Sequence, residues 1–396
     1  MKEETVICNP KGCWRICIVT AVILFCTVGL NITAFSIYIP YITDLLQLTY
    51  SQSANFILVR NLFSFASLFV VKRYYEKLDL RAGFALAMVL AVIGFFLYSQ
   101  ATNFTTLCIA ATISGLAYGL GGMYPTALLI RRWFSVHESL ATGICAASTG
   151  IAGIIGAPVL TALTERFSVR STLRFEAIFL LVCACICTAL IRNYPPNTVP
   201  EKAAGTTKPR TRVKPDGLFF VLLAVGIMGG PGYAYISMLY TTEGMDAYRV
   251  SALISVMGVA LVIGKFALGE LLDRHGALRA PRLFFITALL GCVILCFGDV
   301  GFIPALLAVM LFGFGNALGT LTPPAYAKDI STPETYSATQ QQYQMAFLLG
   351  GLVGSPIPGF VATITQNYKG FYFLILVIVL QAFFAIPWLY RRHNKQ

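Results

Sequence analysis

Two basic side chains lie inside long apolar stretches of this sequence, and they are its best candidates for binding an anion. Arg60 lies in the middle of one apolar stretch, and Lys265 lies about two helical turns from the polar end of another. A charge buried in such a stretch costs about 2.5 kcal/mol or more and is retained mainly for a function or a partner. We therefore predict that both residues contact substrate. The alternatives are that Lys265 extends to the polar end of its segment and that Arg60 binds backbone carbonyl groups or a gate.

Neutral polar side chains in other apolar stretches could add hydrogen bonds to the same site, because pockets combine apolar walls with a few polar groups. We predict six further substrate contacts of this kind: Asn31, Tyr38, Tyr124, Tyr233, Tyr235 and Asn316. For each of them, the alternative is helix packing or anchoring at a membrane interface.

The composition indicates which elements hold these side chains in place. Of the 396 residues, 57% are hydrophobic and 12% are charged, whereas soluble domains carry about 25% charged residues. The apolar residues recur in runs of about 20, the length at which a helix crosses roughly 30 Å of hydrocarbon. We therefore expect an all-α membrane protein with twelve transmembrane helices. The expected spans are residues 15–39, 52–71, 82–100, 105–130, 138–162, 172–191, 217–241, 249–271, 282–299, 302–326, 337–363 and 371–390.

Basic residues are distributed unevenly around the expected helices. With the N-terminus in the cytoplasm, 22 of the 29 Lys and Arg residues fall on the cytoplasmic side and 5 on the outer side. By the positive-inside rule, this distribution predicts that both termini are cytoplasmic in a multi-pass protein of the cell membrane, inner or plasma. Topology and contact with the lipid bilayer thus account for the net charge of +12, and nucleic acid is not an expected partner.

The two halves of the sequence are related by a shift of 198 residues. The Gly-x-x-Gly-x-Pro pattern at 153–158 recurs at 351–356, and matching glycines and prolines link 115–127 to 313–325. Six helices separate the copies, so both have the same orientation and form a parallel repeat about an axis along the membrane normal. The predicted organisation is an N-terminal six-helix bundle at 1–192, a cytoplasmic linker at 193–215 and a C-terminal six-helix bundle at 216–396.

The segment GKFALGELLDRHG at 264–276, after the eighth expected helix, resembles the loop motif of major facilitator transporters. Gly269 would allow close helix approach. Asp273 and Arg274 would latch charges at the cytoplasmic face in one state and release them in another. The resemblance implies the two-bundle major facilitator fold, alternating access and action as a monomer.

Two further segments are similar to a narrower branch, that of the oxalate/formate exchangers and the monocarboxylate transporters. They are the glycine- and tyrosine-rich stretch at 115–125 and the stretch at 132–143, which begins Arg-Trp-Phe. The resemblance implies that Lys265, which replaces the branch's usual arginine, contacts the substrate carboxylate. Leu261 stands where proton-coupled members have an aspartate, and the exchanger's second lysine has no counterpart near 343–347.

Four other residues are predicted to take part in gating. Gly230 and Pro231 lie in a glycine-rich stretch that should bend the seventh helix, because Pro lacks a hydrogen-bond donor and Gly weakens a helix. This bend would be either a hinge or a site of tight packing. Arg131 and Arg132 lie at the cytoplasmic end of the fourth helix.

No unpaired carboxylate is expected at the membrane centre. Asp44 and Glu176 are predicted near the outer ends of their helices, and Asp216 and Glu270 near the inner ends. The usual Asp, Glu or His proton relay is therefore not visible in the sequence. This pattern favours exchange or facilitated diffusion over obligatory proton symport.

These features predict a secondary active or facilitative transporter of small, monocarboxylate-like organic anions that works by alternating access. The first alternative is an exporter of larger amphipathic compounds, and a minor alternative is a non-transporting membrane sensor. An enzyme is not expected, because the sequence shows no nucleophile–base pair. No metal or cofactor is expected either, because His/Glu metal spacing and a phosphate-binding glycine loop are absent from the sequence.

Overall fold

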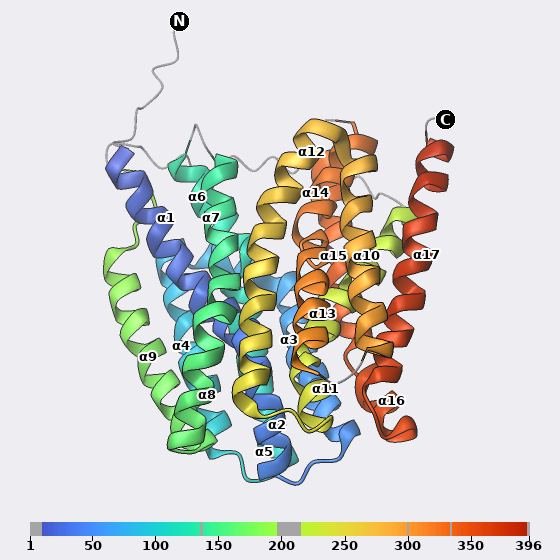
Figure 1. Cartoon of the computed structure of the whole chain (residues 1–396). Helices are drawn as coiled ribbons and strands as arrows, with labels where there is room; N and C mark the ends of the chain where they lie inside the picture. Colours follow the sequence, from blue (N-terminus) through green and yellow to red (C-terminus); the bar gives the residue numbers. More distant parts are fainter. Residues whose placement is uncertain (1–9, 135–137, 196–214, 299–300, 333–334, 394–396) are drawn as a thin grey trace, which may run out of the picture.

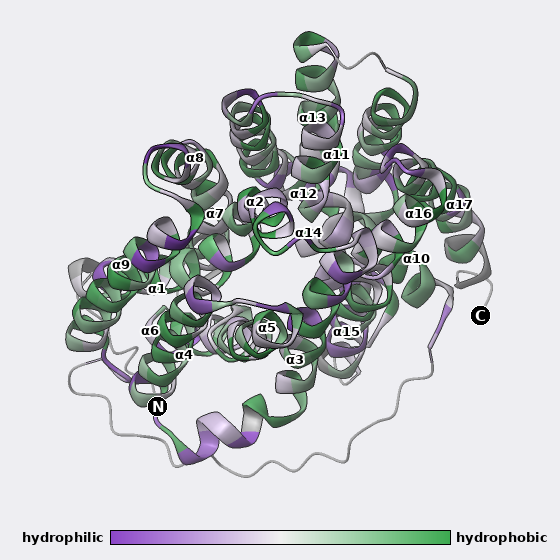
Figure 2. Ribbon diagram, turned by 90° about the horizontal axis from the view of Figure 1, so that it is seen from below, coloured by the Kyte–Doolittle hydropathy of each residue, from purple (hydrophilic) through white to green (hydrophobic). Residues whose placement is uncertain are grey.

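The computed structural model describes residues 10–134, 138–195, 215–298, 301–332 and 335–393, and all elements in these ranges are helical. The helices run side by side as one bundle, and α1 begins at the same end of the bundle where α17 ends (Figure 1). Hydrophobic residues predominate along the helices (Figure 2). Large apolar side chains face outward, among them Ile303, Phe360 and Phe384, which are 78%, 67% and 66% exposed. Such extensive exposed apolar surface is typical of contact with lipid.

The first half of the chain folds into six spans, three of which contain a change of helix type or a break. The first span runs through α1 (Pro10–Leu24), the π-helical η1 (Phe25–Thr33), η2 (Ala34–Ile37) and α2 (Tyr38–Leu45). The next spans are α3 (Tyr50–Lys77), α4 (Leu80–Gln100) and the pair α5 (Phe104–Leu120) and α6 (Met123–Trp133). The last two are α7 (Glu138–Ile151) with π-helical η3 (Ala152–Gly156) and α8 (Ala157–Arg166), and then α9 (Val169–Leu190).

The second half shows a similar succession of helices. It begins with α10 (Gly217–Ile227), π-helical η4 (Met228–Gly232) and α11 (Ile236–Thr242). It continues with α12 (Ala247–Phe297), α13 (Phe302–Gly315) and α14 (Leu318–Ile330). It ends with α15 (Tyr336–Gly354), α16 (Ile357–Thr365) and α17 (Lys369–His393).

The number of spans agrees with the predicted twelve. Within the described ranges, ten helices are long and apolar enough to cross a membrane, and the bent pair 217–232 and 236–242 makes eleven. The 51-residue α12 is about 75 Å long, more than twice the roughly 30 Å of a bilayer core. Gly276 interrupts it with non-helical angles (φ 73°, ψ 171°), a conformation that glycine adopts readily. We therefore count α12 as two spans, which brings the total to twelve.

The seventh span bends where the sequence predicted it. The helix axes of 217–232 and 236–242 differ by 48°, and Pro231 lies in the π-helical segment just before the break. The gating role of Gly230 and Pro231 stays a prediction. So do the domain boundaries, since residues 196–214 of the predicted linker lie outside the described part of the chain.

The two halves meet at the end of the bundle where α2, α11 and α16 lie, which we call the closed end (Figure 1). Ser237 donates a 2.6 Å hydrogen bond to the Ser36 carbonyl, and Tyr235 donates one of 3.0 Å to the Ser53 carbonyl. Deeper in the bundle, Asn61 Nδ2 donates to Ser355 Oγ over 2.7 Å. These bonds join the two halves from the closed end to the middle of the bundle.

Candidate functional site

Arg60 is a buried cation in the middle of α3. Its side chain is 2% exposed, and Nη1 donates a 2.9 Å hydrogen bond to the Asn31 carbonyl of η1. The guanidinium carbon lies 5.2 Å from the centre of the Phe35 ring, within the range of a cation–π contact. Nε has no hydrogen-bond partner. Among the described residues, no acidic side chain forms a salt bridge with this guanidinium, so it keeps unused capacity to bind an anion.

Two neighbouring helices hold Arg60 in place. A Cβ added at Gly115 of α5 would lie 2.2 Å from the Arg60 carbonyl oxygen, so α5 packs directly on the backbone of α3. On the other side, the π-helical geometry of η1 changes its backbone hydrogen-bond pattern, as often occurs at functional sites. The carbonyl that Arg60 binds belongs to this segment.

The side chain of Asn31 is occupied by α5. Its Nδ2 donates to the Ser114 carbonyl over 2.9 Å, and its Oδ1 accepts from Ser114 Oγ over 2.5 Å. Both polar atoms of the Asn31 side chain, a predicted substrate contact, are therefore already hydrogen-bonded to α5 in this conformation. Its backbone positions Arg60 instead.

A cavity of about 90 Å³ lies between the two halves beside Arg60. Polar groups of the N-terminal half line one side of it, and backbone-rich segments of η4 and α15 line the other. Eight of the residues that line it are Arg60, Asn61, Ser64, Tyr118, Gly229, Gly230, Phe347 and Gly351. No acidic residue is among those that line the cavity, so its only formal charge is the positive charge of Arg60.

The far wall of this cavity is built by close helix packing. A Cβ at Gly226 would lie 2.0 Å from the Phe347 carbonyl oxygen, and one at Gly230 would lie 3.0 Å from the Gly351 Cα. Helices α10 and α15 therefore approach each other backbone to backbone. The bend at Pro231 begins at this contact.

Lys265 lies in a different environment on α12. Its side chain is half-buried, and Nζ donates a 3.4 Å hydrogen bond to the Ala146 carbonyl of α7. Lys265 is not among the residues that line the Arg60 cavity. Both charges were predicted to contact substrate, but the structure does not bring them together at the Arg60 cavity.

The helix pairing explains this separation. In each half, the second helix packs on the fifth helix of the other half: α3 contacts α15 and α16, whereas α12 contacts α7, η3 and α8. These two contacts lie on opposite sides of the bundle (Figure 2). Equivalent faces of α3 and α12 therefore point to opposite sides.

Three of the four predicted tyrosines are buried, and two of them form hydrogen bonds away from the Arg60 cavity. Tyr235 donates to Ser53 at the closed end, and Tyr38 donates to Glu176 Oε2 over 2.6 Å. The Tyr233 hydroxyl is buried without a partner, 3.3 Å from where a Cβ on Gly153 would lie. None of these three residues is among those lining the Arg60 cavity.

The fourth predicted tyrosine, Tyr124, is 40% exposed on α6 and does not line the Arg60 cavity either. The chain breaks between α5 and α6 at Gly121 and Gly122, and Tyr118, before this break, reaches the cavity instead. The remaining predicted contact, Asn316, is 8% exposed and lies against η4, with Oδ1 2.7 Å from where a Cβ on Gly229 would lie.

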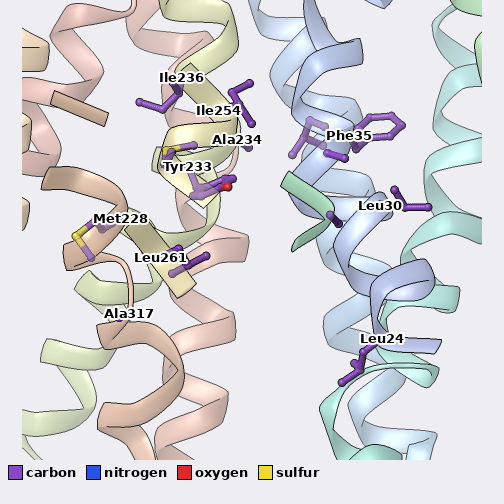
Figure 3. Close-up of a cluster of buried hydrophobic side chains, with 14 of the residues drawn as sticks. Leu24, Leu30, Phe35, Met228, Tyr233, Ala234, Ile236, Ile254, Leu261 and Ala317 are labelled. Atoms are coloured by element: carbon purple, nitrogen blue, oxygen red, sulfur yellow. The ribbon is translucent and has the colours of Figure 1, made fainter. Parts of the chain in front are cut away.

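Leu261 of α12 is part of a buried cluster of apolar side chains. It is 8% exposed and belongs to the same hydrophobic cluster as Tyr233, Leu30 and Phe35 (Figure 3). An apolar side chain thus fills the place where the resemblance would put an aspartate. The α12 side of this cluster therefore carries no acid at that position.

The motif residues beyond the eighth span make local contacts in this conformation. Arg274 forms an exposed pair with Glu270 at 2.5 Å, of a kind worth about 0–1 kcal/mol, and Asp273 is exposed. A Cβ on Gly269 would meet nothing within 4 Å, so the close helix approach expected there does not occur in this structure.

The two predicted gating arginines of α6 are exposed. The guanidinium of Arg132 lies 4.7 Å from the Tyr194 ring of the same half, and no contact is described for Arg131. The gating roles of both residues remain predictions.

Glu176 lies in the first third of α9, and its burial was not recognised from the sequence. It is 4% exposed, and Oε1 has no hydrogen-bond partner. Leu173, Ala177 and Leu180 form a buried stripe on α9, and Glu176 lies on that stripe. The three- and four-residue spacing of this stripe was visible in the sequence and could have identified the buried acid.

Comparisons with known proteins agree on the family and the fold. A model of the Major Facilitator Superfamily matches residues 21–339. Monocarboxylate transporter 12 of Mus musculus is 28% identical over 340 residues, which cover 76% of this chain and 69% of the relative. The agnestins efflux protein AgnL12 of Paecilomyces divaricatus is 24% identical over 386 residues, covering 92% and 84% of the two chains.

Solved structures show the same fold at low sequence identity. A variant of the nucleoside transporter NupG superposes with a TM-score of 0.77 at 12% identity, covering 94% of this chain and 99% of that one. The likeness to this structure concerns the fold alone.

Proposed function

The chain belongs to the Major Facilitator Superfamily, and we propose that it carries small organic anions of the monocarboxylate class across the membrane by alternating access. The observation that carries this proposal is Arg60. It is a buried cation without an acidic partner among the described residues, it lines a cavity between the two halves, and it keeps an unpaired Nε.

The chemistry of Arg60 suits a carboxylate. A guanidinium presents several N–H donors in a planar fork that matches the two oxygens of a carboxylate. One Nη group of Arg60 binds Asn31, and Nε remains unpaired. A carboxylate in the cavity would satisfy this donor and neutralise the buried charge.

The contacts between the halves support an alternating mechanism. The halves are hydrogen-bonded from the closed end to the middle of the bundle, at the level of Asn61 and Ser355. Under the orientation predicted from the basic residues, with both termini cytoplasmic in the cell membrane, the closed end faces outward. This conformation would then accept or release substrate on the cytoplasmic side, and rocking of the halves would open the other side.

Lys265 is the second proposed anion contact. Its hydrogen bond to Ala146 is long, at 3.4 Å, and the side chain is half-buried at the contact between α12 and α7. The monocarboxylate transporters among the relatives support the same substrate class.

Export of larger amphipathic anions is the second candidate function. The relative named as an efflux protein covers 92% of the chain, more than the monocarboxylate transporters cover. Both candidates use a buried cation, so the size of the accepted anion separates them.

Counterflow in proteoliposomes tests the proposal. Vesicles loaded with unlabelled formate, lactate, oxalate, short-chain or aromatic acids are exposed to the matching labelled acid, with wild type, Arg60→Gln and the control Arg249→Gln, whose side chain is exposed and pairs with Asp246. We expect saturable accumulation with wild type and Arg249→Gln, and much weaker accumulation with Arg60→Gln. Absence of counterflow with every acid, from folded wild-type protein, would overturn the monocarboxylate proposal.

A further inference from the structure

Glu176 is a carboxyl group enclosed by the first six spans, away from the Arg60 cavity. It lies on α9 seven residues after Val169, roughly 10 Å along the helix. Its Oε2 accepts the 2.6 Å hydrogen bond from Tyr38, and its Oε1 has no partner. The carboxyl group therefore has one hydrogen bond in a site with almost no solvent access.

The helices packed on α9 are α4, α1, α8 and α2. Seven titratable or charged groups face or adjoin this site. They lie on these helices, on the adjoining η1 and on α9 itself, and they are Tyr38, Cys26, Tyr98, Glu165, Arg170, Arg174 and Cys183. The two arginines do not contact the carboxyl: Arg170 donates to the Ala101 carbonyl over 3.2 Å, and Arg174 is exposed. Among the described residues, no cation forms a salt bridge with Glu176.

An ionised carboxylate in this site would be buried with one hydrogen bond and no counter-charge, which is unfavourable. The neutral acid satisfies the same bond to Tyr38 without that cost. We propose that Glu176 and Tyr38 form a proton-binding site, which holds a proton while the closed end of the transporter is shut.

The surroundings of Tyr38 link this site to the movement of the halves. Tyr38 begins α2, and the preceding segment η2 carries the Ser36 carbonyl that binds Ser237 of the other half. Phe35 of the same segment lies 5.7 Å from the Tyr38 ring and 5.2 Å from the Arg60 guanidinium. Opening the closed end must break the bond between Ser36 and Ser237, and the Tyr38 segment moves with it.

This movement would expose Glu176 to water on the side that opens. A proton would then leave to water or enter from it, and closing would trap the occupied site. The same segment touches Arg60, so anion binding and proton occupancy would influence each other. This coupling rests on the proposed transport function, whereas the proton site itself does not.

Infrared titration of the purified protein tests the proton site without any substrate. The matched control is Glu165→Gln, because Glu165 also accepts a hydrogen bond from a tyrosine of α2, Tyr41, but is exposed. We expect the carbonyl stretch of a protonated carboxyl to persist at about pH 7 in wild type and Glu165→Gln, where an ordinary glutamate is ionised. We expect Glu176→Gln to lack it.

Two results would overturn the proton site. One is the absence of this band in wild type at about pH 7, and the other is its persistence in Glu176→Gln. The glutamine is isosteric with the neutral acid, so we expect the variant to fold, and its thermal unfolding is checked against wild type.

Flux measurements then test the coupling. We expect an inward proton gradient to accelerate net anion uptake by wild type and Glu165→Gln. Glu176→Gln should lose this acceleration and keep counterflow, which needs no net proton movement. An unchanged response to the gradient in Glu176→Gln would overturn the coupling. Loss of counterflow in every protein, with the infrared band intact, would refute the transport proposal and leave the proton site standing.

Discussion

Arg60 and Lys265 are the two intramembrane cations of a repeated fold, and the two halves treat them differently. Arg60 is 2% exposed, retains an unpaired donor and lines a cavity against η4 and α15. Lys265 is half-buried on the opposite side of the bundle, and its ammonium group binds a backbone carbonyl of α7. The repeat conserves helix order but not the chemistry on each side, so a charge cannot be assigned to the site from its span alone.

The largest expected effect is that of removing the charge on the α3 side. Hydrogen bonds to charged groups contribute about 1.5–3 kcal/mol, so Arg60→Gln should lower apparent anion affinity about 10- to 100-fold. Arg60→Lys keeps the charge without the planar fork, so its anion affinity should lie between those of wild type and Arg60→Gln. Concentration-dependent counterflow measures both affinities. Wild-type affinity in Arg60→Gln would contradict the claim that Arg60 contributes more to anion binding than Lys265.

Helix packing should also differ between the α10–α15 contact beside the Arg60 cavity and the α7–α12 contact near Lys265. Gly226→Ala places a methyl group 2.0 Å from the Phe347 carbonyl oxygen, a backbone atom that cannot move alone. Gly150→Ala on the α7 side meets first the Val262 side chain, at 2.5 Å, which can shift. We expect Gly226→Ala to lower the free energy of unfolding by about 1–3 kcal/mol and Gly150→Ala to lower it less.

Thermal unfolding in detergent measures these two changes. Gly269→Ala is the control, since nothing lies within 4 Å of its added methyl group. Equal destabilisation by the Gly226 and Gly150 substitutions would show that the two helix contacts are equally rigid. Loss of transport in a stable Gly269→Ala variant would instead show that the motif packs closely in another conformation.

A smaller effect is expected on the α12 side. Lys265→Gln removes a charge whose described hydrogen bond is long and whose side chain does not line the Arg60 cavity. We expect apparent affinity to fall less than about tenfold, a loss below about 1.4 kcal/mol. A loss larger than that of Arg60→Gln, in the same counterflow assay, would reverse the ranking of the two sites.

The smallest effect is expected at the closed end, where the two halves of the chain meet. Tyr235→Phe removes the hydrogen bond to Ser53, which contributes about 1 kcal/mol, and should shift the balance toward opening about fivefold. Labelling of a cysteine introduced at Ala54, which is buried against Gly359 of α16 in this conformation, reports this opening. An unchanged labelling rate would show that this bond does not hold the end shut.

Sequence reasoning predicted the spans and the bend because both depend on local properties. Apolar runs set the number of helices, and Pro231 lacks the donor that a straight helix needs. A backbone carbonyl partner was one of the predicted alternatives for Arg60, but its identity as Asn31 was not predictable, because no residue pattern marked this π-helical segment. Tyr118 was missed in favour of Tyr124 because the break at Gly121 and Gly122 redirects the chain between them.

Direct binding tests the central claim, that Arg60 provides the anion site. Equilibrium binding of a labelled monocarboxylate identified by counterflow is measured on purified wild type, Arg60→Gln and Lys265→Gln. The account predicts saturable binding by wild type, an affinity lowered about 10- to 100-fold in Arg60→Gln, and at most a modest decrease in affinity in Lys265→Gln. Binding by a folded Arg60→Gln protein with the affinity of wild type would contradict the account.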